Sequence, residues 1–236
     1  MNIEPETAKG VVRRFVQVII ALLLQAAILF FASGRLSWIW AWVYLAIAFA
    51  SLLINGTILL RTSPETIAER GRLSETEPWD KIVSGGWALA LFVVVPLVAG
   101  IDVRFGWTQH LHPAWHPAWN VGGAVLLACG LGLAAWAMIA NAYFSTAVRI
   151  QSDRGQKVCR AGPYRLVRHP GYLGFIMQSL GTPLTLGSLW ALIPGITAAI
   201  LMIIRTALED RFLQLRLSGY REYTREVCHR LVPGMW

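Results

Sequence analysis

Long apolar segments separated by short polar connections dominate this sequence and limit what it can fold into. At about 1.5 Å per residue in a helix, roughly 20 apolar residues cross the hydrocarbon core of a bilayer. Hydrophobic residues make up 56% of the 236 residues and charged residues only 14%. The sequence therefore predicts an all-α, multipass transmembrane helical bundle with five to six spans. The expected spans are residues 15–32, 38–60, 82–101, 121–140, 173–186 and 189–204.

The last two of these segments predict a C-terminal helical hairpin that turns at Gly187 and Ser188. Its first arm is short and carries Gln178, Thr182 and Pro183 among its apolar residues. Polar groups are tolerated at membrane depth where protein covers them. We expect this arm to cross the bilayer, or to be bent or buried among the other helices.

The positive charges are distributed unevenly along the chain, whose formal net charge is +8. If all six segments cross, every Lys and Arg except Arg35 and Arg104 falls on the side that holds both termini. Cytoplasmic loops carry such an excess. We therefore expect a multi-pass cell membrane protein with both termini on the cytoplasmic face. Nucleic-acid binding is not expected, since no basic stripe alternates with exposed aromatic residues.

Three other patterns have structural interpretations. The repeat HPAWHPAW contributes to a cluster of three histidines that could hold a metal, but prolines adjoin two of them and no carboxylate or cysteine is near, so we expect no metal. The glycines at 130 and 132, with Ala135, resemble a dinucleotide fingerprint, but in an apolar helix they predict close helix packing. Three cysteines without CxxC spacing predict reduced thiols. The histidines are His110, His112 and His116, and the cysteines are Cys129, Cys159 and Cys228.

Residues 161–174, AGPYRLVRHPGYLG, form the segment richest in reactive side chains. Gly162 and Pro163 indicate a turn, and Pro170 suits the first position of a helix. The segment predicts a basic loop that leads into the start of an apolar helix, where anionic groups are favoured. A loop of this charge could also serve only to orient the protein in the membrane.

The motif RHPGYLG, followed by an apolar hairpin, Glu209-Asp210 and GYREY, resembles the isoprenylcysteine carboxyl methyltransferase and phospholipid methyltransferase superfamily. Those proteins are integral membrane enzymes that use S-adenosylmethionine. The resemblance is strongest over the last hundred residues and looser through SPETIAERGR, a predicted short helix ending near Gly71. It implies a single domain over residues 1–236, with the cofactor-binding part at about 141–236. The family's acidic pair is usually Glu-Glu, so Asp210 is one methylene shorter.

The resemblance also implies a cytoplasmic cofactor site built from the 142–172 loop and the C-terminal tail. The expected catalytic residues are Arg168, His169 and Glu209. The expected cofactor-binding residues are Gly162, Tyr164, Arg165, Arg168, His169, Pro170, Tyr172, Gly174, Glu209, Asp210, Tyr220 and Tyr223.

Each expected role has a plain structural alternative. Arg168 can pair with the carboxylate of the cofactor, or it can be an orienting cation. Glu209 can accept from hydroxyl or ammonium groups, or it can form a helix-surface pair with Arg205. His169 can accept a proton or cap a helix. The tyrosines of the expected site can supply aromatic walls. Tyr220 and Tyr223 can instead pack the tail onto the membrane surface.

Four functions are compatible with these patterns. The resemblance favours methyl transfer from S-adenosylmethionine to a membrane-embedded or hydrophobic acceptor, most like isoprenylcysteine carboxyl O-methylation. A phospholipid or small-molecule N- or S-methyltransferase is the nearest alternative. Membrane sterol and enone reductases that use NADPH have a similar C-terminal pattern. A non-catalytic membrane scaffold is the fourth possibility. The expected partners are the bilayer and a lipid or prenylated acceptor.

Overall fold

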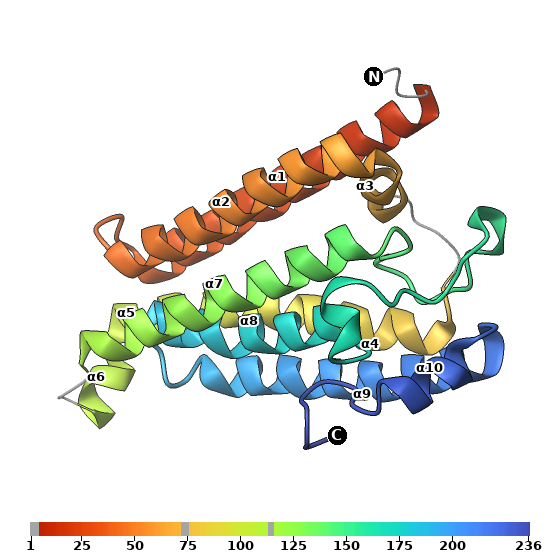
Figure 1. The fold of residues 1–236 in the computed structure, drawn as a ribbon. Coiled ribbons are helices and arrows are strands. Elements are labelled where there is room, and N and C mark those ends of the chain that lie inside the picture. Colours follow the sequence, from red (N-terminus) through yellow and green to blue (C-terminus); the bar gives the residue numbers. More distant parts are fainter. Residues whose placement is uncertain (1–4, 72–75, 113–115) are drawn as a thin grey trace.

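The computed structural model describes residues 5–71, 76–112 and 116–236, and the described residues form helices and loops without a strand (Figure 1). The all-helical fold predicted from the sequence is therefore confirmed. The elements are α1 (Pro5–Ser33), α2 (Ile39–Thr62), α3 (Pro64–Gly71), α4 (Pro78–Leu89), the π-helical turn η1 (Ala90–Val94), α5 (Val95–Phe105), α6 (Trp107–Leu111), α7 (Pro117–Ala140), the short 3₁₀ turns η2 (Ser152–Arg154) and η3 (Gly162–Arg165), α8 (Pro170–Leu186), α9 (Leu192–Arg216) and α10 (Tyr220–Glu226).

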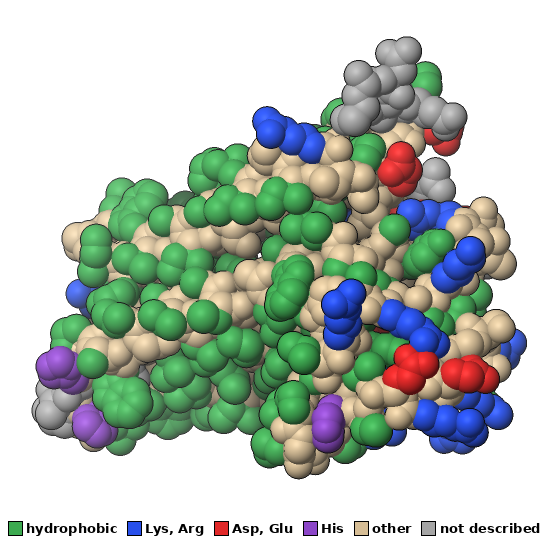
Figure 2. All heavy atoms as spheres, viewed as in Figure 1, with side chains coloured by type: hydrophobic (Ala, Val, Ile, Leu, Met, Phe, Trp, Pro, Cys, Tyr) green, Lys and Arg blue, Asp and Glu red, His purple; other side chains and the backbone are tan. Residues whose placement is uncertain are grey.

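Five helical segments within the described residues are long and apolar enough to cross a membrane: α1, α2, the continuous helix formed by α4, η1 and α5, α7, and α9. This is a multi-pass membrane protein. Hydrophobic side chains cover the middle of the bundle (Figure 2). The third segment contains a π turn because Pro96 has no backbone N–H for the usual helical bond, and the Val95 N–H instead reaches the carbonyl of Ala90. The first helix begins at Pro5, ten residues before the predicted span, and Gly10 packs against Ala68 of α3.

The short arm of the predicted hairpin, α8, is buried among its neighbours. Its 17 residues span about 26 Å at 1.5 Å per residue. The side chains of Ser179 and Thr182 are fully buried, and each hydroxyl donates to the carbonyl one turn earlier in the same helix. The expectation that this arm is buried among the other helices is confirmed. Gly187 ends α8 with a φ of 75°, and the chain turns there into α9.

Helices α7 and α8 approach closely where glycines face each other. A Cβ added to Gly130 would lie 2.7 Å from the carbonyl oxygen of Gly174, and a Cβ added to Gly174 would lie 2.5 Å from the carbonyl oxygen of Gly130. Backbones this close leave no room for a side chain. The interpretation of Gly130 as a packing residue is confirmed, and Gly174, expected in the cofactor site, belongs to the same contact.

Gly130→Ala is expected to destabilise the protein by about 1 to 3 kcal/mol, because the added methyl group overpacks the contact between α7 and α8. Gly132→Ala is the matched control, since it lies in the same helix with nothing within 4 Å of its added Cβ. The control is expected to be neutral or slightly stabilising through helix propensity. Unfolding of both variants in detergent measures the difference, and equal stabilities would contradict the packing account.

The polar loops gather at one end of the bundle. Lys, Arg, Asp and Glu side chains concentrate around α10 and the neighbouring loops (Figure 2). Arg149 in the loop after α7 forms an ion pair with Glu69 of α3 at 2.8 Å. The loop of residues 141–169, α3 and the C-terminal tail therefore share one end, as the charge distribution predicted.

A buried ion pair ties this end together. Asp80 of α4 is 1% exposed and accepts from Arg205 of α9 at 2.7 and 3.2 Å. Its carboxylate also accepts from the backbone N–H of Val148 at 2.9 Å. The alternative in which Arg205 pairs with Glu209 on the helix surface is wrong, because Arg205 turns inward to Asp80.

Candidate functional site

The segment Arg168–Pro170, together with the turn before it, is called the RHP loop. It is held against the C-terminal tail by backbone hydrogen bonds. The N–H of Arg168 donates to the carbonyl of His229 at 3.0 Å, and the N–H of His169 donates to that of Arg230 at 2.9 Å. Pro170 then begins α8, as its missing N–H predicts. The side chains of Arg168 and His169 are both buried, so the motif faces the interior rather than the solvent.

Asp210 of α9 is the acceptor around which this region is built. Its side chain is fully buried, and it accepts from Arg168 at 2.8 and 3.1 Å, an arrangement that matches the guanidinium fork to the two carboxylate oxygens. Arg230 and Gln214 donate to its Oδ2 atom at 3.0 and 2.8 Å. The hydroxyl of Tyr220 donates to Oδ1 at 3.0 Å. One carboxylate thus joins the RHP loop, α9, α10 and the tail.

Arg168 forms most of its hydrogen bonds within the protein. Besides its bonds to Asp210, its Nη1 atom donates to the carbonyls of Val227 and Cys228, both at 2.8 Å. Burial by itself lowers the pKa of this guanidinium, but the Asp210 bonds raise it, and the net shift is upward. The sequence suggested a direct bond from Arg168 to the carboxylate of a ligand. In this arrangement four of its five N–H donors bind groups of the protein, and Arg168 orders the loop and the tail.

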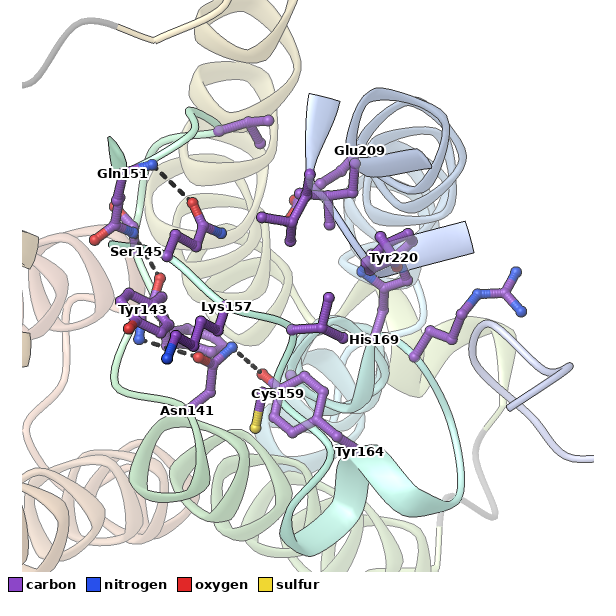
Figure 3. A pocket seen from close by; sticks show the side chains of 18 of the residues that line it. Asn141, Tyr143, Ser145, Gln151, Lys157, Cys159, Tyr164, His169, Glu209 and Tyr220 are labelled. Atoms are coloured by element: carbon purple, nitrogen blue, oxygen red, sulfur yellow. Dashed lines mark hydrogen bonds between the residues drawn. The ribbon is translucent and has the colours of Figure 1, made fainter. Parts of the chain in front are cut away.

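His169 and Glu209 lie on the same wall of a cleft. The ring of His169 stacks on that of Tyr172 at 5.6 Å, and the Tyr172 hydroxyl donates to Glu209. The Nε2 atom of His169 is 3.2 Å from Oδ1 of Asp210 and 3.2 Å from the hydroxyl of Tyr220. Figure 3 shows His169, Glu209 and Tyr220 together on one side of the cavity. Two segments about forty residues apart in the sequence therefore meet here.

The loop after α7 supplies the opposite wall, with residues that the motifs did not single out (Figure 3). Gln151 is buried, and its side chain donates to the carbonyl of Tyr143 at 2.7 Å while its N–H donates to Gln156. The sequence signal was only the polar composition of residues 141–158 ahead of the motif. The cavity between the walls is narrow, about 90 Å³. The lining residues on this side include Asn141, Tyr143, Ser145, Arg149, Gln151, Gln156, Lys157 and Cys159.

The expected cofactor-binding residues separate into two groups. Those that line the cleft are Tyr164, Arg168, His169, Tyr172, Glu209, Tyr220 and Tyr223. The others lie outside its lining. A Cβ on Gly162 would lie 3.0 Å from Trp136, Arg165 is exposed, and Pro170 and Gly174 are buried in the start of α8. Asp210 lies behind the wall that contains His169 and Tyr220, and its carboxylate orients both side chains.

Tyr164, Tyr220 and Tyr223 are neutral side chains in the cleft. Burial raises the pKa of Tyr164 and of Tyr223, and burial together with the charge of Asp210 raises that of Tyr220. The Tyr223 hydroxyl donates to the carbonyl of Tyr164 at 2.6 Å, which joins α10 to η3. The alternative in which Tyr220 and Tyr223 only pack the tail on the membrane surface is wrong, because both are buried against the RHP loop.

The lining of the cleft matches the chemistry of S-adenosylmethionine. Aromatic rings offer walls for an adenine, and Glu209 offers an acceptor for hydroxyl or ammonium groups. Arg149 has a buried Nε atom without a hydrogen-bond partner among the described residues, and it can donate to a ligand's carboxylate. Lys157 is exposed at the rim of the same cleft. The residue types present therefore suit the chemical groups of this cofactor.

Metal-binding groups were not found within the described residues, where no three His, Cys, Asp or Glu side chains come together. Residues 113–115, in the middle of the predicted histidine cluster, lie outside the described residues. His116 uses its Nδ1 atom to accept the N–H of Ala118 at the start of α7.

The fold and the cleft together define a helical integral membrane protein with a polar, aromatic-walled site at one end of its bundle. Residues 119–218 match the family described as phospholipid methyltransferase. Two rice proteins, from Oryza sativa subsp. indica and subsp. japonica, are each 31% identical over 142 residues, which cover 54% of this chain and 72% of each relative. Both are named probable protein-S-isoprenylcysteine O-methyltransferase. The chain belongs to the isoprenylcysteine carboxyl methyltransferase and phospholipid methyltransferase superfamily. It is a membrane methyltransferase.

Proposed function

We propose that this methyltransferase transfers a methyl group from S-adenosylmethionine to a hydrophobic acceptor that reaches it from the membrane. The reaction is most like isoprenylcysteine carboxyl O-methylation, with methylation of a phospholipid or of a small hydrophobic N or S nucleophile as the alternative. The whole of residues 1–236 acts as one domain, and residues 141–236 bind the cofactor. The site and both termini face the cytoplasm, as the excess of Lys and Arg at that end favours.

The observation that carries this proposal is the meeting of the RHP loop and Glu209 on one wall of an aromatic cleft. Glu209 accepts from the ribose hydroxyls or the ammonium group of the cofactor, and Arg149 and Lys157 face its carboxylate. Arg168 acts through Asp210 to hold the wall in place. The cofactor supplies an electrophilic methyl group, so the protein contributes alignment and exclusion of water.

The cleft between the two walls is narrow for the proposed cofactor. A volume of about 90 Å³ is small for a nucleoside, while residues 141–158 carry few buried apolar side chains. Segments with few buried contacts open at low cost in free energy. We expect residues 141–158 to move outward and then close over the cofactor.

The acceptor comes from the lipid side through a second, larger cavity of about 670 Å³. Its lining comes from α1 and α2 on one side and from α4, α7 and α8 on the other. Figure 1 shows how these two groups of helices are arranged. Ser145 lines both this cavity and the cleft, so the two spaces meet there. A carboxylate acceptor is already ionised at neutral pH and needs no strong base. An amine would have to lose a proton, and His169 or Glu209 would accept it.

Calorimetric titration of the purified protein in detergent tests the cofactor. We expect S-adenosylmethionine and its demethylated product to bind, and NADPH not to bind at the same concentrations. Binding of NADPH alone would indicate a membrane reductase, and the absence of binding by all three would indicate a scaffold. Either result would overturn the proposed function.

A further inference from the structure

The larger cavity has an apolar body whose lining comes from several helices. Leu22 of α1, Leu52 of α2, Trp87 of α4 and Leu131 of α7 contribute side chains to it. The space is large enough for an acyl or prenyl chain and lies among the membrane-spanning helices. Such a lining selects for hydrophobic chains but does not by itself distinguish one headgroup from another.

One group of side chains in this cavity does carry that information. Four cations line it, and none of the described lining residues is Asp or Glu. Arg205 is neutralised by Asp80 at 2.7 Å. Arg70 of α3 is different, because its buried Nη1 atom has no hydrogen-bond partner among the described residues. Its guanidinium lies 5.2 Å from the centre of the Phe144 ring. The cations are Arg14, Arg70, Lys81 and Arg205.

The environment of Arg70 lacks a matching negative charge. Burial, and then the charges of Arg14 and Arg205, lower the pKa of Arg70 to about 9. The group is still a cation at neutral pH, and it sits among other cations in a place that water reaches poorly. A bound anion would supply both the missing acceptor and the missing charge.

The end of the larger cavity that holds Arg70 and Arg205 lies beside the proposed methyl-transfer site. The guanidinium of Arg205 is 5.1 Å from the centre of the Tyr172 ring, and the Tyr172 hydroxyl donates to Glu209 in the cleft. Phe175 lines the larger cavity and lies 6.2 Å from the Tyr172 ring, centre to centre. A headgroup held near Arg70 would thus lie at the end of the larger cavity that adjoins the cleft.

We propose that Arg70, assisted by Arg14, is the specificity-determining residue of the acceptor site and binds the carboxylate of a single-chain amphiphile in this cavity. This inference rests on the proposed function. One carboxylate oxygen forms a bond to the methyl carbon while the bond from methyl to sulfur breaks, and the electron pair stays on sulfur. No proton moves. The resulting ester is neutral, so it loses its attraction to Arg70 and returns to the lipid.

Paired ligands test the inference in protein saturated with the demethylated cofactor. N-acetyl-S-farnesylcysteine carries the carboxylate, and its primary amide has the same chain without the charge. Quenching of tryptophan fluorescence reports occupancy, since Trp87 lines the cavity. We expect the wild-type protein to bind the acid at least about tenfold tighter than the amide, as charged hydrogen bonds in a dry site require.

The variants separate a specific role of Arg70 from a structural one. In Arg70→Gln the preference for the acid is expected to fall to about one, and Arg70→Lys is expected to restore part of it. Arg61→Gln is the control, because it removes the same charge from an exposed position at the same end of the bundle. Cofactor affinity, measured in the same samples, is expected to stay unchanged in all three variants.

Four results would overturn the inference. They are equal binding of acid and amide by the wild type, retention of the preference in Arg70→Gln, loss of it in Arg61→Gln, and tighter binding of farnesyl phosphate than of the acid. If Arg70→Gln does not fold, equal binding of the acid and the amide by the wild-type protein would still overturn the inference. Failure of S-adenosylmethionine to bind would instead remove the proposed function, so the two failures are distinguishable.

Discussion

Glu209→Ala is expected to weaken binding of S-adenosylmethionine and of its demethylated product by about 100-fold or more. Hydrogen bonds to a charged group contribute about 1.5 to 3 kcal/mol each, and this carboxylate faces the cleft with capacity for two. The side chain is half-buried and lies beside His169 and Tyr220 in Figure 3. Its Tyr172 partner remains, so the substitution removes an acceptor without removing the wall.

Calorimetry of the purified variant measures this loss, and Glu222→Ala provides the control. Glu222 lies on α10, close in sequence to the tyrosines of the cleft, but its side chain is exposed. The control is expected to bind as the wild type does. A Glu209→Ala protein whose affinity lies within about threefold of the wild type would exclude Glu209 from the cofactor site.

Asp210→Ala is expected to destabilise the protein by about 3 to 5 kcal/mol, because it leaves buried Arg168 without its counter-charge. Arg230 and the Tyr220 hydroxyl lose the same acceptor. The C-terminal tail is therefore expected to detach from the RHP loop well before the rest of the bundle unfolds. Unfolding in detergent, followed by protease cleavage within residues 217–236, measures both effects.

Asp153→Ala is the control for this experiment. It also removes an aspartate that forms an ion pair with an arginine, Arg149, but its side chain is 53% exposed. Exposed pairs contribute about 1 kcal/mol or less, so this variant is expected to change stability little. Equal stabilities of the Asp210→Ala and Asp153→Ala variants would contradict the role of Asp210 in holding the C-terminal tail against the RHP loop.

Local patterns in the sequence were sufficient to predict the membrane-spanning segments, the burial of α8 and the short helix α3. Each of these predictions depends on residues that lie close together in the sequence. Hydropathy marks the spans, the polar Gln178 and Thr182 mark a buried arm, and Pro64 and Gly71 mark the ends of α3. The beginning of α1 at Pro5 was missed because its first turns are polar, and they are helical because they pack on α3.

The partners within the site could not be predicted, because they depend on side chains brought together from distant parts of the chain. The motif placed Arg168 near an acid, but the sequence alone did not show that Asp210 takes the guanidinium and Glu209 faces the cleft. The pair of Asp80 and Arg205 joins residues 125 positions apart. The role of Arg149 likewise depends on how the loop after α7 folds over the cleft.

Hydrogen–deuterium exchange with and without S-adenosylmethionine tests most directly whether the two segments enclose one ligand. The cofactor is expected to slow exchange in peptides from residues 141–172 and from residues 205–226 together, with the same dependence on its concentration. Peptides from α6, at the other end of the bundle, are expected to be unaffected (Figure 1). Protection of only one of the two segments, or of α6 instead, would contradict a shared cleft.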